Sequence, residues 1–138
     1  MMTAHAKSRI PDRTVEGRAM FDAGLREFNA GRYFEAHDIW EDFWHQLNGP
    51  DRRFLQGLIQ LAVGAYHHEM DNPAGARSLW GRSIAKLEEY PEEHWGIDRG
   101  AWVEWIKGYL SSWDGAPHPE QLSFNEQHFP SYLPLAPD

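Results

Sequence analysis

The chain has 138 residues, 21 acidic and 13 basic side chains and a formal net charge of −8, which suits one domain and argues against binding to nucleic acid or an anionic membrane. It contains no cysteine, so disulfides, thiolate metal sites and cysteine nucleophiles are excluded, and any metal must take nitrogen and oxygen ligands. Residues 1–13 lack the apolar run of a signal peptide, and no stretch reaches the ~18–20 apolar residues of a membrane span. These features predict a soluble cytoplasmic protein.

Apolar residues recur at helical spacing along most of the chain, while almost no segment alternates with period two, so the sequence predicts an all-α domain. Asp51, Asn72 and Asp98 stand where they can act as helix N-caps, and Gly31 stands in a stop position. The short connections favour antiparallel neighbours, so we expect a single-domain bundle of helical hairpins. About five helices are expected in chain order, at residues 14–29, 33–47, 51–70, 73–89 and from 98 onward.

After Ser112 the chain becomes rich in proline, at a spacing that no helix tolerates. The same stretch carries scattered aromatic side chains, which disordered segments usually lack. We therefore divide the chain into a bundle domain at 14–112 and an extended arm at 113–138, which packs on the bundle or on a neighbouring subunit. A disordered tail is the alternative. The prolines of the arm are Pro117, Pro119, Pro130, Pro134 and Pro137.

A weak internal repeat appears when the sequence is shifted by forty residues, which lays residues 31–47 over residues 71–87. Segment 28–36 also resembles the turn and second-helix start of a tetratricopeptide hairpin. Such repeats normally need at least ~3 copies to be stable, and only about two fit in this chain. The similarity therefore supports stacked antiparallel hairpins more than a peptide-binding solenoid. The matched pairs are Ala36 with Ala76, Trp40 with Trp80, and Leu47 with Leu87.

His37 and Glu41 lie four residues apart on the second expected helix. At ~100° per residue they fall on the same half of the helix as its aromatic side chains, while most of its other carboxylates, including Asp38, fall opposite. A buried imidazole or carboxylate is costly unless it is paired, hydrogen-bonded or bound to a metal. We therefore expect a polar pair on the core face, which marks a candidate site. The aromatic residues on that half are Tyr33, Phe34, Trp40 and Trp44.

The third expected helix carries a narrow polar strip in an otherwise apolar surface. If this helix forms an antiparallel hairpin with the second, Gln56 or Gly57 lies near Glu41, and Gln60 lies near His37. His67 lies about two turns further along and joins the site only if a tilt brings it closer. We expect a pocket between the two helices, centred on His37, Glu41 and Gln60, in which Gln56, Gln60 and Trp44 contact a small ligand. Alternatively, the strip faces solvent.

Two functions fit these residues. The first is a site for a divalent metal such as zinc, manganese or iron, or for a small ligand, with His37, Glu41 and His67 as metal ligands. A metal-activated water would make hydrolysis available there. The second is a non-enzymatic interaction module in which aromatic residues of the fifth helix and the arm drive self-association into a homo-oligomer. In this second function the His37–Glu41 pair only fixes the helix register. Enzymatic and non-enzymatic functions both remain open on the sequence alone.

Residues 37–44, which read HDIWEDFW, resemble the H-x-x-x-E-x-x-W/Y signature of the bacterial and archaeal domain-of-unknown-function 309 family. The resemblance continues through segments 57–67, 72–76 and 96–98, so that it covers roughly residues 20–110. It implies a small all-helical fold in which His37 and Glu41 bind a metal. It implies no established activity.

Overall fold

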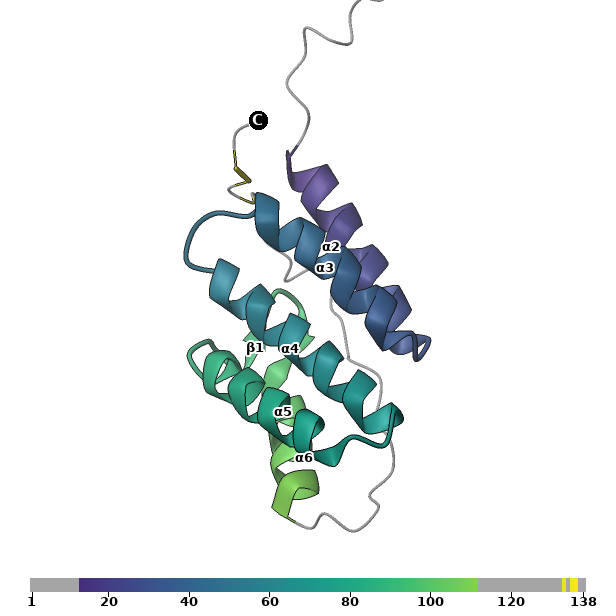
Figure 1. Cartoon of the computed structure of the whole chain (residues 1–138). Coiled ribbons are helices and arrows are strands. Elements are labelled where there is room, and N and C mark those ends of the chain that lie inside the picture. The colour runs from purple at the N-terminus through teal and green to yellow at the C-terminus, as the bar shows by residue number, and fades with distance from the viewer. Residues whose placement is uncertain (1–12, 112–132, 134, 137–138) are drawn as a thin grey trace, which may run out of the picture.

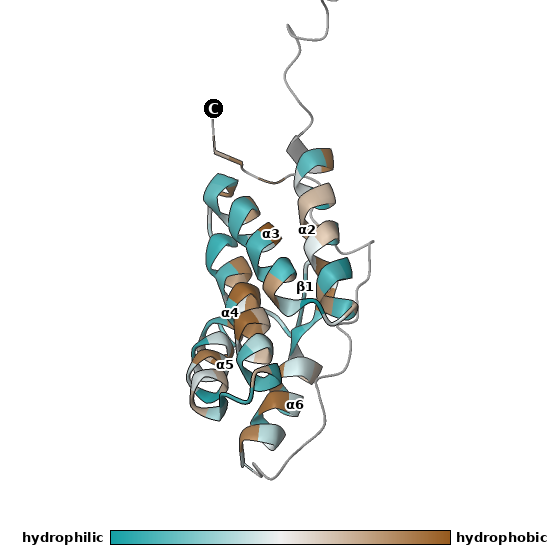
Figure 2. Ribbon diagram, turned by 45° about the vertical axis from the view of Figure 1, so that its right-hand side comes forward, coloured by the Kyte–Doolittle hydropathy of each residue, from teal (hydrophilic) through white to brown (hydrophobic). Residues whose placement is uncertain are grey.

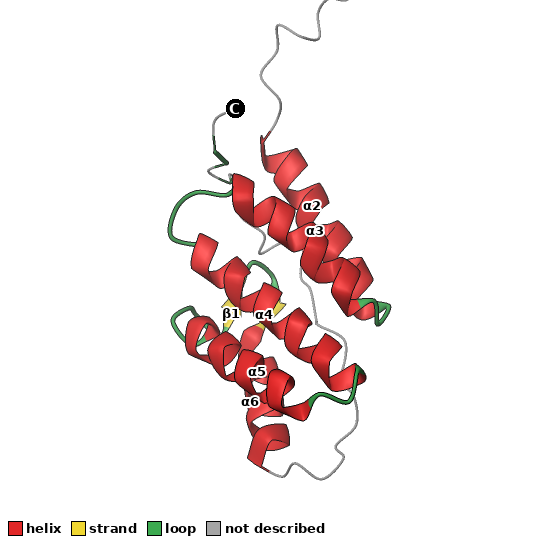
Figure 3. Cartoon of the chain, in the orientation of Figure 1, coloured by secondary structure: helices red, strands yellow, loops and turns green. Residues whose placement is uncertain are grey.

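The computed structural model describes residues 13–111, 133, 135 and 136, and over these residues the all-α prediction is confirmed (Figure 1). An antiparallel pair of two-residue strands, in which His94 faces Ile97, joins the last two helices. The strands are too short to form a layer, so helices make up the whole architecture (Figure 3). The elements are α2 (Arg13–Asn29), α3 (Tyr33–Gln46), α4 (Arg52–Glu69), α5 (Pro73–Leu87), β1 (Glu93–His94), β2 (Ile97–Asp98) and α6 (Arg99–Ser111).

The helices form two antiparallel hairpins, α2 with α3 and α4 with α5, and α4 also packs against α3 (Figure 1). Buried side chains from both hairpins and from α6 make one continuous core. Figure 2 shows a run of hydrophobic residues along α4, whereas the ribbon of α3 is largely hydrophilic on the side in view. This agrees with the expectation that the third helix is apolar over most of its surface. Within the described part of the chain, no helix combines the length and the apolar composition that crossing a membrane requires.

Two of the three expected N-caps are confirmed. The side chain of Asn72 accepts a hydrogen bond from the Gly75 backbone N–H at 3.2 Å, and that of Asp98 accepts one from the Ala101 N–H at 3.0 Å. The expectation for Asp51 is wrong, because its side chain makes no capping hydrogen bond to α4. Its carboxylate instead binds residues more than forty positions away in the chain, which local sequence reasoning does not reveal.

The forty-residue repeat corresponds to a repeated packing motif. The indole N–H of Trp40 donates to the carbonyl of Phe21 at 3.0 Å, and the indole N–H of Trp80 donates to the carbonyl of Leu61 at 3.1 Å. Both indoles are fully buried. Since Phe21 and Leu61 are also forty residues apart, each hairpin fastens its second helix to its first with the same buried hydrogen bond.

Each indole also crosses a glycine of the first helix in its hairpin. A Cβ atom on Gly24 would lie 2.1 Å from the Trp40 indole nitrogen, and one on Gly64 would lie 2.4 Å from the Trp80 ring. Real Cβ atoms do not approach so closely, so both positions require glycine. The connecting turns match as well, because Gly31 and Asp71 both have positive φ, at 82° and 58°.

Three described residues of the arm lie against the first hairpin. Leu133 and Leu135 are only 1% and 6% exposed. Leu135 pairs with Leu47 in an isolated antiparallel bridge, and the Ala136 N–H donates to the carbonyl of Gln46. These contacts are made within one chain. The division into domains at 14–112 and 113–138 stays a prediction, because the rest of the arm, including all five of its prolines, lies outside the described residues.

Candidate functional site

Three side chains of α3 form a group with suitable atoms for binding a metal. His37, Asp38 and Glu41 each offer one ligand atom, and these atoms all lie within 4.8 Å of one another. His37 is half-buried, whereas both carboxylates are exposed. Helical geometry explains the group, because positions four apart lie one turn above each other and the intervening Asp38 is offset from Glu41 by only ~60°.

The orientation of the His37 ring is fixed by the backbone of its own helix. Its Nδ1 atom lies 2.7 Å from the carbonyl oxygen of Phe34. A carbonyl oxygen can only accept, so Nδ1 carries the hydrogen and Nε2 of the neutral ring keeps its lone pair. Histidines that bind metals usually donate their second N–H in this way. The ring also packs edge-on against the Phe34 ring, with 4.9 Å between the centroids.

The expectation that His37 and Glu41 lie in the interior is wrong. The pair occupies the flank of α3 beside the core, where Glu41 is exposed. The sequence pattern places Phe34 and Trp44 on the core face together with Tyr33 and Trp40, but Phe34 is 51% exposed and Trp44 is only half-buried. The cost of burying a carboxylate therefore does not apply to Glu41. The buried stripe of α3 and its C-cap consists of Tyr33, Ala36, Trp40, Phe43 and Leu47.

His67 does not join this group, and Asp38 takes the third place. The Nδ1 atom of His67 lies 3.1 Å from the side-chain amide of Asn72, which places the ring at the start of α5. The sequence prediction put Asp38 on the opposite face because it assumed that the site pointed into the core. An exposed site at the edge of the helix would have included it, since the three residues occupy positions i, i+1 and i+4.

The other predicted ligand contacts, Trp44, Gln56 and Gln60, lie on α3 and α4. The indole N–H of Trp44 donates to the Arg52 carbonyl at 3.1 Å, and the Arg52 guanidinium lies 3.6 Å from the centre of the indole. Trp44 therefore closes the turn between α3 and α4. Gln56 and Gln60 are half-buried on α4. The Oε1 atom of Gln60 is buried and has no hydrogen-bond partner among the described residues.

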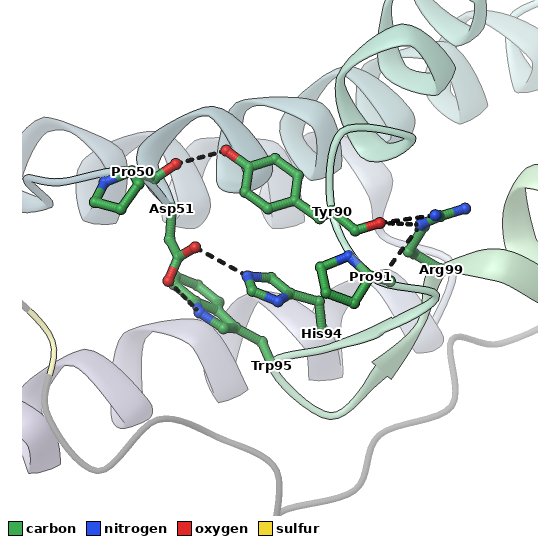
Figure 4. A network of polar contacts seen from close by, with 7 residues as sticks. All are labelled: Pro50, Asp51, Tyr90, Pro91, His94, Trp95 and Arg99. Carbon is green, nitrogen blue, oxygen red and sulfur yellow. Dashed lines mark hydrogen bonds and ion pairs between the residues drawn. The ribbon is translucent and has the colours of Figure 1, made fainter.

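A polar network that the sequence did not reveal joins the start of α4 to the β-hairpin (Figure 4). Asp51 accepts a hydrogen bond from His94 Nε2 at 2.9 Å and one from the Trp95 indole N–H at 3.1 Å. Beside it, the hydroxyl of Tyr90 donates to the carbonyl of Pro50 at 2.5 Å. We call these five residues the Asp51 clamp. The clamp links the α3–α4 turn to the connection between α5 and α6.

The charge on Asp51 is stabilised by these donors. The hydrogen bond from His94 is the largest cause that lowers the pKa of the Asp51 carboxyl, and the bond from Trp95 acts in the same direction. Partial burial opposes them. The clamp is therefore strongest when Asp51 is ionised, which makes it a stability element whose effect depends on pH.

In a comparison with known proteins, the segment that contains the α3 group matches a sequence-family model. Residues 21–79 match the family described as "Domain of unknown function (DUF309)". This confirms the resemblance inferred from the sequence for that segment. The DUF309 segment contains His37, Asp38 and Glu41 together with all of α3 and α4, but it stops short of the β-hairpin and the arm.

Two relatives extend the comparison. "Uncharacterized protein YpuF" of Bacillus subtilis (strain 168) is 44% identical over 84 residues, which are 58% of this chain and 48% of the relative. An "Uncharacterized protein" of Aquifex aeolicus (strain VF5) is 24% identical over 102 residues, which are 71% of this chain and 29% of that protein. The chain thus spans about half or less of the length of these relatives.

Proposed function

We propose that the α3 group, His37, Asp38 and Glu41, binds a divalent transition-metal ion. The observation that carries the proposal is the approach of one imidazole and two carboxylates to within 4.8 Å of one another. Nitrogen and oxygen donors in this ratio suit zinc, manganese or iron. Three protein ligands leave at least one coordination position for water or for a small ligand.

The charges of the group support a cation. Asp38 and Glu41 are three positions apart on one helix, and like charges at this spacing destabilise a helix by ~0.2–0.5 kcal/mol. Neither carboxylate has an ion-pair partner among the described residues. A bound divalent ion would remove this repulsion and place both charges in favourable interactions.

The internal repeat also favours a functional role over a structural one. The forty-residue shift places Arg77, Ser78 and Gly81 of α5 at the positions that correspond to the α3 group. All three are exposed, and the second hairpin forms the same buried tryptophan contact without a histidine or a carboxylate there. The hairpin architecture therefore does not require the α3 group.

Hydrolysis by a metal-activated water is the enzymatic form of this proposal, and ligand binding without turnover is the other form. The alternative, self-association through aromatic residues of the fifth helix and the arm, remains a prediction.

Isothermal titration calorimetry and thermal melting with Zn²⁺, Mn²⁺ and Fe²⁺ test the proposal. Metal at 100 times its Kd should stabilise the native state by about 2.7 kcal/mol. We expect Glu41→Gln and His37→Gln to lose both the binding heat and the rise in Tm. Asp42→Asn is the matched control, because Asp42 is an exposed carboxylate of the same helix outside the group, and it should bind as the wild type does. Absence of binding for all three metals, or equal loss in the control, would contradict the proposal.

A further inference from the structure

A hollow of about 390 Å³ lies where the start of α3 meets the end of α4. Its walls include Arg32, Tyr33, Phe34 and Glu35 from the first hairpin, and Tyr66 and Glu69 from α4. The volume falls within the ~300–1,000 Å³ that is typical of sites for small molecules. The α3 group does not line this hollow, although His37 packs against the ring of Phe34.

Aromatic rings form one part of the wall. Phe34 is 51% exposed, and its ring centre lies 5.4 Å from that of the half-buried Tyr66. An exposed phenylalanine is costly to hydrate, because its apolar surface stays in contact with water. The faces of aromatic rings carry partial negative charge, so they attract a cation placed over them.

Carboxylates without a close ion-pair partner form another part. Glu35 and Glu69 are exposed and make no ion pair or hydrogen bond with a described side chain. Arg32 is the cation among the described lining residues, and its Nε donates to Glu27 at 2.5 Å. The Nη2 atom of the same guanidinium donates to the other carboxylate oxygen of Glu27 at 3.3 Å. Arg32 is therefore paired with Glu27, and the nearby charge of Glu35 also acts on it. With two glutamates and one arginine, the lining of the hollow keeps a net negative charge.

The pKa of Tyr33 and the partial charges at the two helix ends are consistent with a negative charge in the hollow. Burial raises the pKa of the Tyr33 hydroxyl, and the negative charge of Glu69 raises it further, so the field of Glu69 reaches the wall of the hollow. The C-terminal end of α4 adds partial negative charge. The N-terminal end of α3 adds partial positive charge, which Glu35 in the first turn of that helix offsets.

We propose that this hollow binds a small organic ammonium ion, with the cationic group over the rings of Phe34 and Tyr66 and beside the carboxylates of Glu35 and Glu69. An anion would meet two unpaired carboxylates, and a neutral apolar molecule would leave them without a partner. A quaternary ammonium ion or a protonated primary alkylamine supplies both apolar surface and positive charge. This site is separate from the metal site of the proposed function and does not depend on it.

Choline and its neutral carbon analogue 3,3-dimethylbutan-1-ol distinguish charge recognition from simple apolar binding. Each is titrated into the full-length protein at constant ionic strength with EDTA present, which keeps metal ions out of the measurement. Two-dimensional ¹H–¹⁵N NMR reports the location and calorimetry the affinity. We expect choline to shift the amide signals of residues 31–35 and 66–69, and the neutral alcohol to bind at least about fivefold more weakly. Propylamine tests whether a primary amine is accepted as well.

Two variants and a control locate the interaction. Glu69→Gln removes one carboxylate and should weaken choline binding about fivefold, the factor for one charge pair at 4 Å in water. Phe34→Leu keeps an apolar side chain but removes the ring, and should cost about two- to fivefold. Glu104→Gln changes an exposed carboxylate on α6 and should leave the affinity unchanged. Equal affinity for choline and the alcohol, no shift at either segment, or equal weakening by Glu69→Gln and Glu104→Gln would overturn the proposal.

Discussion

The two hairpins of this protein share a core but differ on their surfaces. Trp40 and Trp80 are buried in the same way, each crossing a glycine and donating to a carbonyl of the preceding helix. At the positions outside the core that follow the same shift, α3 carries the group His37, Asp38 and Glu41, whereas α5 carries an arginine, a serine and a glycine. The shared positions therefore serve folding, and the α3 group is where a function specific to the first hairpin can reside.

The two turns show the same division. In the first hairpin the Arg32 N–H donates to the Glu27 carbonyl at 2.9 Å, and in the second the Asn72 N–H donates to the His67 carbonyl at 2.8 Å. The backbone geometry is thus repeated while the side chains change. Asn72 caps α5, whereas Arg32 makes no side-chain cap on α3 and instead binds Glu27. His67, a candidate metal ligand from the sequence, is explained by its place in the second turn.

The largest expected effect tests the shared core. Replacing a buried tryptophan by alanine leaves a large cavity and should reduce the free energy of unfolding by about 3–5 kcal/mol. We expect Trp40→Ala and Trp80→Ala to fall in this range and to differ little from each other, as measured by urea unfolding. A small cost for one of them and a large cost for the other would show that the hairpins are not equivalent in energy.

The crossing glycines provide the next test. Gly24→Ala and Gly64→Ala place a methyl group within 2.5 Å of an indole, so each should destabilise the protein by about 1–3 kcal/mol through overpacking. Gly81→Ala is the matched control, because a Cβ there meets nothing within 4 Å. In a helix interior this control should raise stability by about 0.5–1 kcal/mol. Destabilisation by all three substitutions would contradict the role assigned to the crossing.

The Asp51 clamp gives a prediction for the second hairpin, because it binds the start of α4 to the β-hairpin. Asp51→Asn should reduce stability at pH 7 by about 1–2 kcal/mol, because the lost charge-assisted bonds are partly exposed to solvent. The pKa of Asp51 is lowered from its ordinary value of 3.8. Its stabilising effect is therefore complete well above pH 3.8 and is lost as the pH falls through the lower folded-state pKa.

Unfolding curves of wild type and Asp51→Asn between pH 2 and pH 7 check this prediction. The difference in stability should be constant near neutrality and should shrink in the acid range. Asp98→Asn is a useful control, because asparagine also caps helices well. A difference that grows as the pH falls would have the wrong sign for a carboxyl with a lowered pKa.

Helices and turns could be predicted from the sequence because their determinants are local. The apolar spacing, Gly31, and the Asn72-Pro73 start of α5 all act within a few residues of the element they define. The Asp51 clamp could not be predicted, because it joins residues 43 and 44 positions apart. Asp51 stands at an N-cap position in the sequence. Its carboxylate instead accepts hydrogen bonds from long-range partners, so it does not cap α4.

The candidate site was only partly predictable. The spacing of His37 and Glu41 placed them together on one side of α3, but their depth depends on the phase of the buried stripe. That phase was set by Ala36 and Phe43, whereas the more conspicuous Phe34 lies half-exposed. A small residue such as Ala36 gives little signal in the sequence, although it is fully buried. The site therefore lies at the edge of the core, and Asp38 joins it.

The smallest expected effect distinguishes a functional from a structural role of the α3 group. If Glu41 served the fold, Glu41→Gln would destabilise the metal-free protein, as the loss of a required hydrogen bond does. Since Glu41 is exposed and repels Asp38, we instead expect the free energy of unfolding to stay unchanged or to rise by no more than about 0.5 kcal/mol. Urea unfolding in EDTA, compared with Asp42→Asn, measures it. Destabilisation well above 1 kcal/mol by Glu41→Gln alone would mean that the first hairpin needs this carboxylate in a way that the second hairpin, with Gly81 in its place, does not.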